Sequence, residues 1–85
     1  MDREDIRIKA AAIKYKGEIY EGRRHVEIIE RIWDLHGYTE IPEDDQGFVT
    51  NDSRFVNRWQ AGAIAFDAGQ TKTRHEKLIS EHLVF

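Results

Sequence analysis

The absence of cysteine is the feature that most constrains how this chain can fold. A chain of 85 residues buries only about 60–65% of the surface that its unfolded form exposes. Natural domains of this size often gain stability from disulfides, a bound metal or a partner subunit. Without cysteine, disulfides and thiolate metal sites are excluded. We therefore expect a thin core that gains further stability through self-association as a homo-oligomer.

The apolar runs in the sequence are short. The longest, such as Ala10-Ala11-Ala12-Ile13, contain only a few residues, whereas about 20 are needed to span a bilayer. Residues 1–5 are charged and lack the apolar stretch of a signal peptide, so we expect a disordered N-terminus. We therefore predict a cytoplasmic protein without membrane contacts, organised as a single domain over residues 6–85.

The charge balance limits the class of ligand. The chain has 13 basic and 16 acidic residues and a net charge of −3. Non-specific nucleic-acid binding requires a broad positive field, so we do not expect it here. A few arginines can still create a local positive pocket on an acidic protein, and a small anionic ligand remains compatible with this composition.

Two periodic segments predict a β-hairpin followed by a helix. Apolar and polar residues alternate, with some irregularity, over residues 6–20, and Lys16-Gly17 supplies the turn. Gly22 breaks this pattern, and a helix is predicted over residues 23–36, with Gly37 at its end. Its apolar stripe consists of Val26, Ile29, Ile32 and Trp33.

The second half of the sequence predicts short strands and a second helix. In chain order, the predicted elements are an acidic loop at 38–45, a strand at 46–50, a turn at 51–53, an extended piece at 54–56, a helix at 58–68, a polar loop at 70–77 and a short strand or turn at 78–85. Asn57 is a favourable N-cap for the second helix, and Gly69 closes it. The predicted fold class is thus α+β, with an N-terminal hairpin and a small sheet packed on two helices.

The segment Gly22-Arg23-Arg24-His25 is the first candidate for a binding site. Free backbone N–H groups at the start of a helix favour anions, and Arg24 and His25 add cationic side chains. The helix dipole disfavours cations at this end, so the alternative is that these side chains are solvated or form salt bridges. The sequence leaves both roles open.

The segment Arg54-Phe55-Val56-Asn57-Arg58 is the second candidate. Arginine binds phosphate in a bidentate manner, and an aromatic ring can stack on a base. Phe48 and Phe55 are the rings available for such stacking. A phenylalanine in a strand more often belongs to the core, which we expect for Phe55 while leaving Phe48 open.

Metal and catalytic motifs are weak. The histidines lack metalloenzyme spacing, and the acidic segment Glu40–Asp45 lacks the ligand pattern of a calcium loop. The sequence has neither a nucleophile elbow nor a glycine-rich phosphate loop. We therefore predict no metal site, no cofactor and no enzymatic activity. A small enzyme that uses His25 or Glu27 as a base is the remaining catalytic alternative.

Six sequence blocks together resemble a family of small phage and prophage proteins. The blocks are residues 8–13, 22–25, 46–50, 54–58, 65–70 and 78–83. Some proteins with this pattern look like phage sponge proteins that counter the Thoeris defence, which bind the cyclic ADP-ribose signal as homo-oligomers without cleaving it. The resemblance implies an anti-defence protein in the host-cell cytoplasm, with a small anionic nucleotide as its ligand.

The resemblance also implies a ligand-binding set. Its members would be Arg24 and His25 on phosphate, Phe48 stacked on a base or lining the pocket, Arg54 and Arg58 as further phosphate contacts, and Gln70 and Thr71 at the pocket edge. Two departures from the expected pattern bear on this transfer. Trp59-Gln60 stands where the pattern has a charged pair, and His82 stands where it has an acid.

A different class of function is also compatible with the sequence. A small acidic phage protein can inhibit or adapt a host protein by binding it directly, and aromatic side chains are enriched in such interfaces. Trp33, Trp59 and Phe85 are the candidates for exposed contacts of this kind.

Overall fold

The computed structural model describes residues 6–83, so the disorder predicted for residues 1–5 and the contact predicted at Phe85 lie outside the described residues. The strands are β1 (Ile8–Tyr15), β2 (Glu18–Gly22), β3 (Gln46–Thr50) and β4 (Phe55–Asn57). The helices are α1 (His25–His36) and α2 (Arg58–Asp67), with short 3-10 helices η1 (Glu43–Asp45) and η2 (Ser80–His82).

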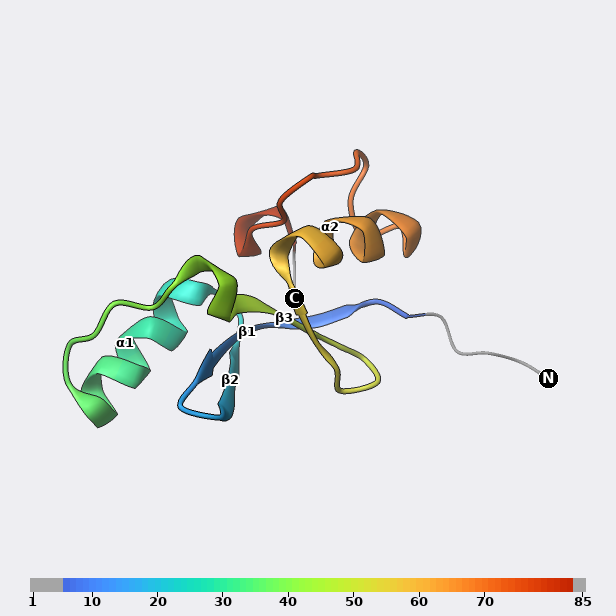
Figure 1. Ribbon diagram of the computed structural model, residues 1–85. Helices are drawn as coiled ribbons and strands as arrows, with labels where there is room; N and C mark the ends of the chain where they lie inside the picture. The colour runs from blue at the N-terminus through green and yellow to red at the C-terminus, as the bar shows by residue number, and fades with distance from the viewer. Residues whose placement is uncertain (1–5, 84–85) are drawn as a thin grey trace.

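The four strands form one sheet in the order β2-β1-β3-β4, and every neighbouring pair is antiparallel. α1 packs against β1 and β2, whereas α2 packs mainly against β3 and β4. The two helices therefore cover different parts of the sheet, as can be followed in Figure 1. This arrangement confirms the predicted α+β class and the small sheet packed on two helices.

The predicted hairpin is present, and its irregular alternation has a structural cause. Lys16 and Gly17 form the turn with φ angles of 51° and 82°, which suit a tight hairpin. The pairing of β1 with β3 shifts between Ile8 and Ala10, which marks a β-bulge. Because of this extra residue, Ile8 and Ala11 are both buried, although strict alternation predicts that Ile8 shares a face with Ala10.

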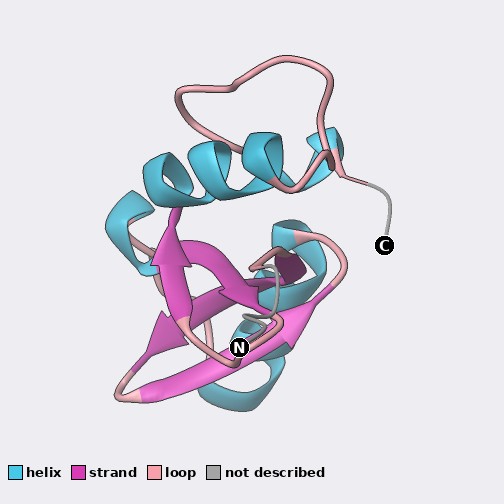
Figure 2. Ribbon diagram, turned by 90° about the vertical axis from the view of Figure 1, so that its right-hand side faces the viewer, coloured by secondary structure: helices cyan, strands magenta, loops and turns pink. Residues whose placement is uncertain are grey.

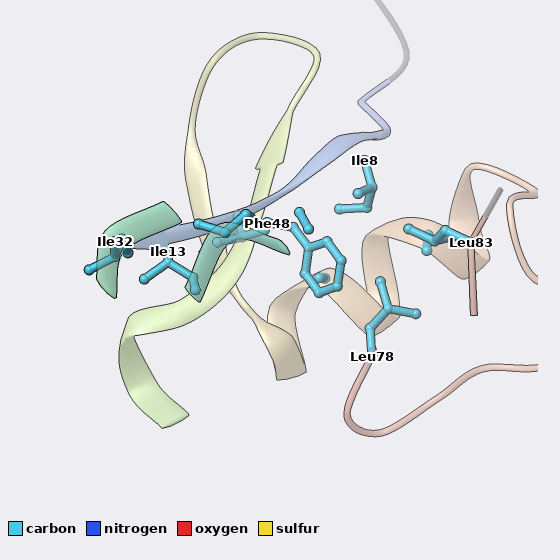
Figure 3. Close-up of a cluster of buried hydrophobic side chains, with 11 residues drawn as sticks. Ile8, Ile13, Ile32, Phe48, Leu78 and Leu83 are labelled. Atoms are coloured by element: carbon cyan, nitrogen blue, oxygen red, sulfur yellow. The ribbon is translucent and has the colours of Figure 1, made fainter. Parts of the chain in front are cut away.

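Phe48 lies at the centre of a single apolar core. It is fully buried and is among the largest buried side chains in the described chain. Figure 3 shows Phe48 between Ile13 and Ile32 on one side and Leu78 and Leu83 on the other. The core is therefore continuous from the α1 end of the sheet to the segment that follows α2.

α1 begins later than predicted, and the face that it buries differs from the predicted apolar stripe. Gly22 is the last residue of β2, so it ends a strand and does not open the helix. The inward positions of α1 are His25, Ile28 and Ile32, whereas Val26 is 57% exposed. The apolar spacing alone missed this phase because the first inward position is occupied by a histidine.

α2 matches the prediction closely. The Asn57 side chain accepts a hydrogen bond from the Gln60 backbone N–H at 2.8 Å, and the Gln60 side-chain oxygen accepts one from the Asn57 backbone N–H at 3.0 Å, which completes a capping box. Gly69, with φ of 76°, follows the helix end. The chain then runs back along α2, as Figure 2 shows, and ends in η2 where a short strand or turn was predicted.

Within residues 6–83, no helix combines the length and apolar character needed to cross a membrane.

Candidate functional site

Arg24 occupies the N-cap position of α1 but does not cap it with its side chain. Its guanidinium donates to the Arg23 backbone oxygen at 3.0 Å. The helix start therefore has no arginine side chain folded over its free N–H groups. This geometry matches the solvated alternative that the sequence left open.

His25 is built into the core. It is 5% exposed, its Nε2–H donates to the Gly47 carbonyl at 2.7 Å, and its ring meets the edge of Phe48 at a centroid distance of 5.1 Å. Burial lowers the pKa of the imidazole, although the hydrogen bond to Gly47 acts in the opposite direction. In the single chain, His25 joins α1 to β3 as a neutral packing residue.

The two phenylalanines differ in burial, and the core position expected for Phe55 is wrong, whereas the open question of Phe48 is decided in favour of the core. Phe48 is fully buried, so neither of its faces is open for stacking on a base. Phe55, expected in the core, is partly exposed, and the Lys14 ammonium lies 4.9 Å from its ring centroid. The Phe55 ring lies against Gly47, where an added Cβ would come within 2.8 Å of it. The same Cβ would lie 2.1 Å from the Val56 carbonyl oxygen, so the close approach of β4 requires glycine at this position.

Arg54 and Arg58 are each occupied within the chain. The Arg54 Nε donates to Asp52 at 3.0 Å, in the turn between β3 and β4. The Arg58 side chain is mostly buried, donates to the Gln46 Oε1 at 2.9 Å and pairs with Glu43 at 3.4 Å. The Arg58 Nε is buried without a partner in the described chain. Neither guanidinium is held open toward a shared cleft with Arg24.

Gln70 and Thr71 have local structural partners. The Gln70 side-chain amide both donates to the Ile8 carbonyl and accepts from the Ile8 N–H, each at 2.8 Å, as a neighbouring strand would. The Thr71 hydroxyl donates to the Thr73 carbonyl at 2.9 Å. The predicted set is therefore dispersed over several elements, and its role in ligand binding stays a prediction.

A cavity of about 580 Å³ lies where α2 begins and the returning segment passes it. We call it the basic cavity; its lining residues are Trp59, Arg74, His75 and Glu76. Trp59 is 42% exposed, and the Lys77 ammonium lies 5.9 Å from its ring centroid. Within residues 6–83, Arg74 forms no hydrogen bond or ion pair, which distinguishes it from the three predicted arginines.

Close packing holds the returning segment on α2. A Cβ on Gly62 would lie 2.0 Å from the His75 carbonyl oxygen, so only glycine allows this approach. The Leu78 N–H donates to the Arg58 carbonyl at 3.0 Å. The rings of His75 and His82 stack at 3.7 Å, and burial together with the nearby His75 lowers the pKa of His82.

A second cavity, of about 370 Å³, lies between α1 and the segment that follows it. We call it the acidic cavity; its lining residues are Ile29, Trp33, Tyr38, Thr39, Glu40, Ile41, Pro42 and Gln46. The rings of Trp33 and Tyr38 meet at 4.9 Å, and the Trp33 indole N–H donates to the Thr39 carbonyl at 2.8 Å. Within the described part of the chain, no group of three or more His, Asp or Glu side chains is arranged to hold a metal ion.

Sequence reasoning missed Arg74 and His75 as site residues. A signal was present, because the run Thr71-Lys72-Thr73-Arg74-His75 is basic and follows the helix that carries Trp59. The run was predicted to be a polar loop, since sequence alone does not show that Gly62 draws it onto α2.

The fold and cavities define a small α+β protein whose two tryptophans each line an open cavity. The sequence model of the Phage T4 y16D protein family matches residues 7–84, and the chain belongs to that family. The resemblance to small phage proteins is thereby confirmed. No curated protein and no solved structure matches the chain.

Proposed function

We propose that this phage-family protein binds and sequesters a small anionic nucleotide, of the cyclic ADP-ribose type, without cleaving it. The observation that carries the proposal is the exposed Trp59 ring beside the unpaired Arg74 in the basic cavity. This combination supplies the stacking surface and the cation that the resemblance calls for. The proposal moves the contact surface from the predicted set to the basic cavity.

The chemistry of the lining suits such a ligand. A base can stack on an exposed indole, which contributes about 1–3 kcal/mol per base in single-stranded nucleic-acid complexes. The Arg74 guanidinium can hold a phosphate with two hydrogen bonds. The Glu76 carboxylate can accept hydrogen bonds from ribose hydroxyls. The volume of about 580 Å³ falls within the usual range of ligand pockets, roughly 300–1,000 Å³.

A homo-oligomer is part of the proposal. Trp59 and Phe66 are seven residues apart on α2, so they lie on the same side of the helix, and both are more than 40% exposed. A second copy packed on this stripe would bury apolar area and close the cavity over the ligand. Sedimentation equilibrium tests this part: a monomer at all concentrations, with and without ligand, contradicts it.

The binding claim is tested by isothermal titration with cyclic ADP-ribose isomers and cyclic oligonucleotides. We expect binding to at least one of them, and chromatography should recover that nucleotide intact. Trp59→Ala and Arg74→Gln should each weaken the affinity by about tenfold or more, as expected for loss of a stacked base or a charged hydrogen bond. No heat with any of these nucleotides contradicts the proposal.

Matched arginine variants separate the two locations. Arg24→Gln and Arg54→Gln remove the same charge from the predicted set and should leave the affinity within about twofold, because surface charges act weakly over distance in salt. If these variants lose binding while Arg74→Gln keeps it, the ligand occupies the predicted set and the basic cavity is the wrong site.

A further inference from the structure

We propose that the acidic cavity is a docking site for an arginine or lysine side chain of a partner protein. It is separate from the basic cavity, because the acidic cavity lies between α1 and the segment after α1. The proposal does not depend on nucleotide binding, because the two cavities share no lining residue.

The shape and lining of the acidic cavity suit a long side chain with a charged end. Ile29, Ile41 and Pro42 provide apolar surface for a methylene stem. The rings of Trp33 and Tyr38 line the cavity with their centroids 4.9 Å apart, and a cation over an aromatic ring is attracted by the ring quadrupole. The Trp33 ring is fixed by its hydrogen bond to Thr39, so this surface exists before a partner arrives.

The hydrogen-bonding groups in the lining favour a donor. The Trp33 N–H is already used by Thr39, and the Gln46 side chain donates to the Ile41 carbonyl while accepting from Arg58. The Glu40 carboxylate, by contrast, has no ion-pair or hydrogen-bond partner within residues 6–83. A guanidinium or ammonium group supplies donors and a positive charge to this carboxylate.

The surrounding charge favours the same occupant. The acids near the lining residues in sequence are Glu30, Asp34, Asp44 and Asp45, whereas Glu43 is paired with Arg58 and Lys77, and Arg58 also donates to the lining Gln46. Arg31 is the nearby cation on α1, and its guanidinium is turned to the Glu21 carbonyl on β2. A negative local field attracts a basic segment and disfavours an anionic one.

The rim of the acidic cavity points to a protein and away from a free small cation. Val26 is seven residues before Trp33, so both lie on the same side of α1. Val26 is 57% exposed and Tyr38 is 77% exposed. These apolar surfaces extend beyond the volume that one cation fills. A partner segment with an apolar residue next to its arginine or lysine would cover both.

The test uses a dye-labelled hexapeptide, Gly-Leu-Arg-Leu-Arg-Gly, with its ends capped, and reads its fluorescence anisotropy on titration with the full chain. We expect saturable binding that Glu40→Gln and Tyr38→Ala each weaken by about tenfold. Glu27→Gln removes the same charge from α1 away from the lining and should leave the affinity within about twofold.

Companion ligands and variants decide between occupants. The peptide with glutamine in place of arginine should not bind; equal binding overturns the requirement for a cation. Tetramethylammonium that competes as well as the peptide, mole for mole, overturns the assignment to a protein side chain. If the chain forms a dimer that Glu40→Gln dissociates and the peptide does not bind, the occupant is a second copy and the proposal of a different partner is wrong. A fold check by circular dichroism on every variant excludes unfolding as the cause of lost binding.

Discussion

The acidic and basic cavities are built in the same way but differ in the charged side chains that line them. Each lies between a helix and the irregular segment that follows it, and each is lined by one of the two tryptophans of the chain. Glu40 lines one cavity and Arg74 lines the other. Among the described residues, Glu40 is the one acidic or basic side chain that lines the acidic cavity, whereas the lining of the basic cavity combines the Arg74 guanidinium with the Glu76 carboxylate.

The two cavities differ in what holds them in place. The acidic cavity rests on a hydrogen bond from the Trp33 indole to Thr39. The basic cavity rests on backbone packing, with the His75 carbonyl against Gly62 and the Leu78 N–H bonded to Arg58. The basic cavity should therefore be the more sensitive to a change in volume on α2.

The largest effect is expected from Phe48→Ala, which removes the ring that joins the two halves of the core. Loss of a buried phenylalanine should lower the free energy of unfolding by about 3–5 kcal/mol. Denaturant unfolding measures this change, with the exposed Tyr38→Ala as a control of small effect. A stable Phe48→Ala protein that loses only nucleotide binding would restore Phe48 as a ligand contact.

Gly62→Ala should change the structure around the basic cavity and leave the acidic cavity as it is. The added methyl group meets the His75 carbonyl, and overpacking of this kind costs about 1–3 kcal/mol. That loss must exceed the gain of helix propensity from alanine, which is about 0.5–1 kcal/mol. Amide and indole NMR shifts should change around Trp59 and stay near their original values around Trp33. Equal changes at both tryptophans contradict the separate anchoring of the cavities.

Acidification should lower the stability of the chain through the buried His25 and the partly buried His82. The folded pKa values of His25 and His82 lie below the ordinary value of 6.5, so the unfolded chain binds more protons. The contribution is complete above pH 6.5 and is lost as the pH falls through the lowered pKa values. Thermal unfolding between pH 7.5 and 5 measures it, and His82→Gln should flatten the curve in part. Stability that rises as the pH falls from 7.5 to 5 would contradict the lowered pKa values of the two histidines.

The smallest effect is expected from Glu43→Gln, which loosens the connection between the two cavities. Glu43, on the segment after α1, pairs with Arg58 and with Lys77 beside the basic cavity. These pairs reach the surface, so the change in unfolding free energy should be slight. Hydrogen exchange should instead rise locally near Lys77. Asp44→Asn is the matched control. An equal rise of hydrogen exchange near Lys77 in this variant would contradict a specific link through Glu43.

The elements predicted best from sequence are those fixed by local chemistry. The turn at Lys16-Gly17, the strand at Gln46–Thr50 and the cap at Asn57 are present as predicted, because each depends on a few neighbouring residues. The inward phase of α1 was missed because a histidine, which apolar periodicity does not count, takes the place expected of Val26.

The candidate site was harder to predict because it depends on contacts between distant residues. The sequence predicted that the guanidinium groups of Arg54 and Arg58 are free to bind a ligand. In the fold, Arg54 pairs with Asp52, and Arg58 pairs with Glu43 and donates to Gln46. Trp59 and Arg74 are brought together only by the chain reversal after α2. Such a reversal is set by packing at long range, which residue spacing does not record.

The two tryptophan indole groups allow one direct measurement of the central claim, since each reports on one cavity. An ¹H–¹⁵N NMR titration of the full chain would follow both indole N–H signals, first with a cyclic ADP-ribose isomer and then with the arginine hexapeptide. The account predicts crossed responses: the nucleotide moves the Trp59 signal and the peptide moves the Trp33 signal. Movement of the same signal by both ligands, or nucleotide binding that leaves Trp59 unchanged, would contradict it.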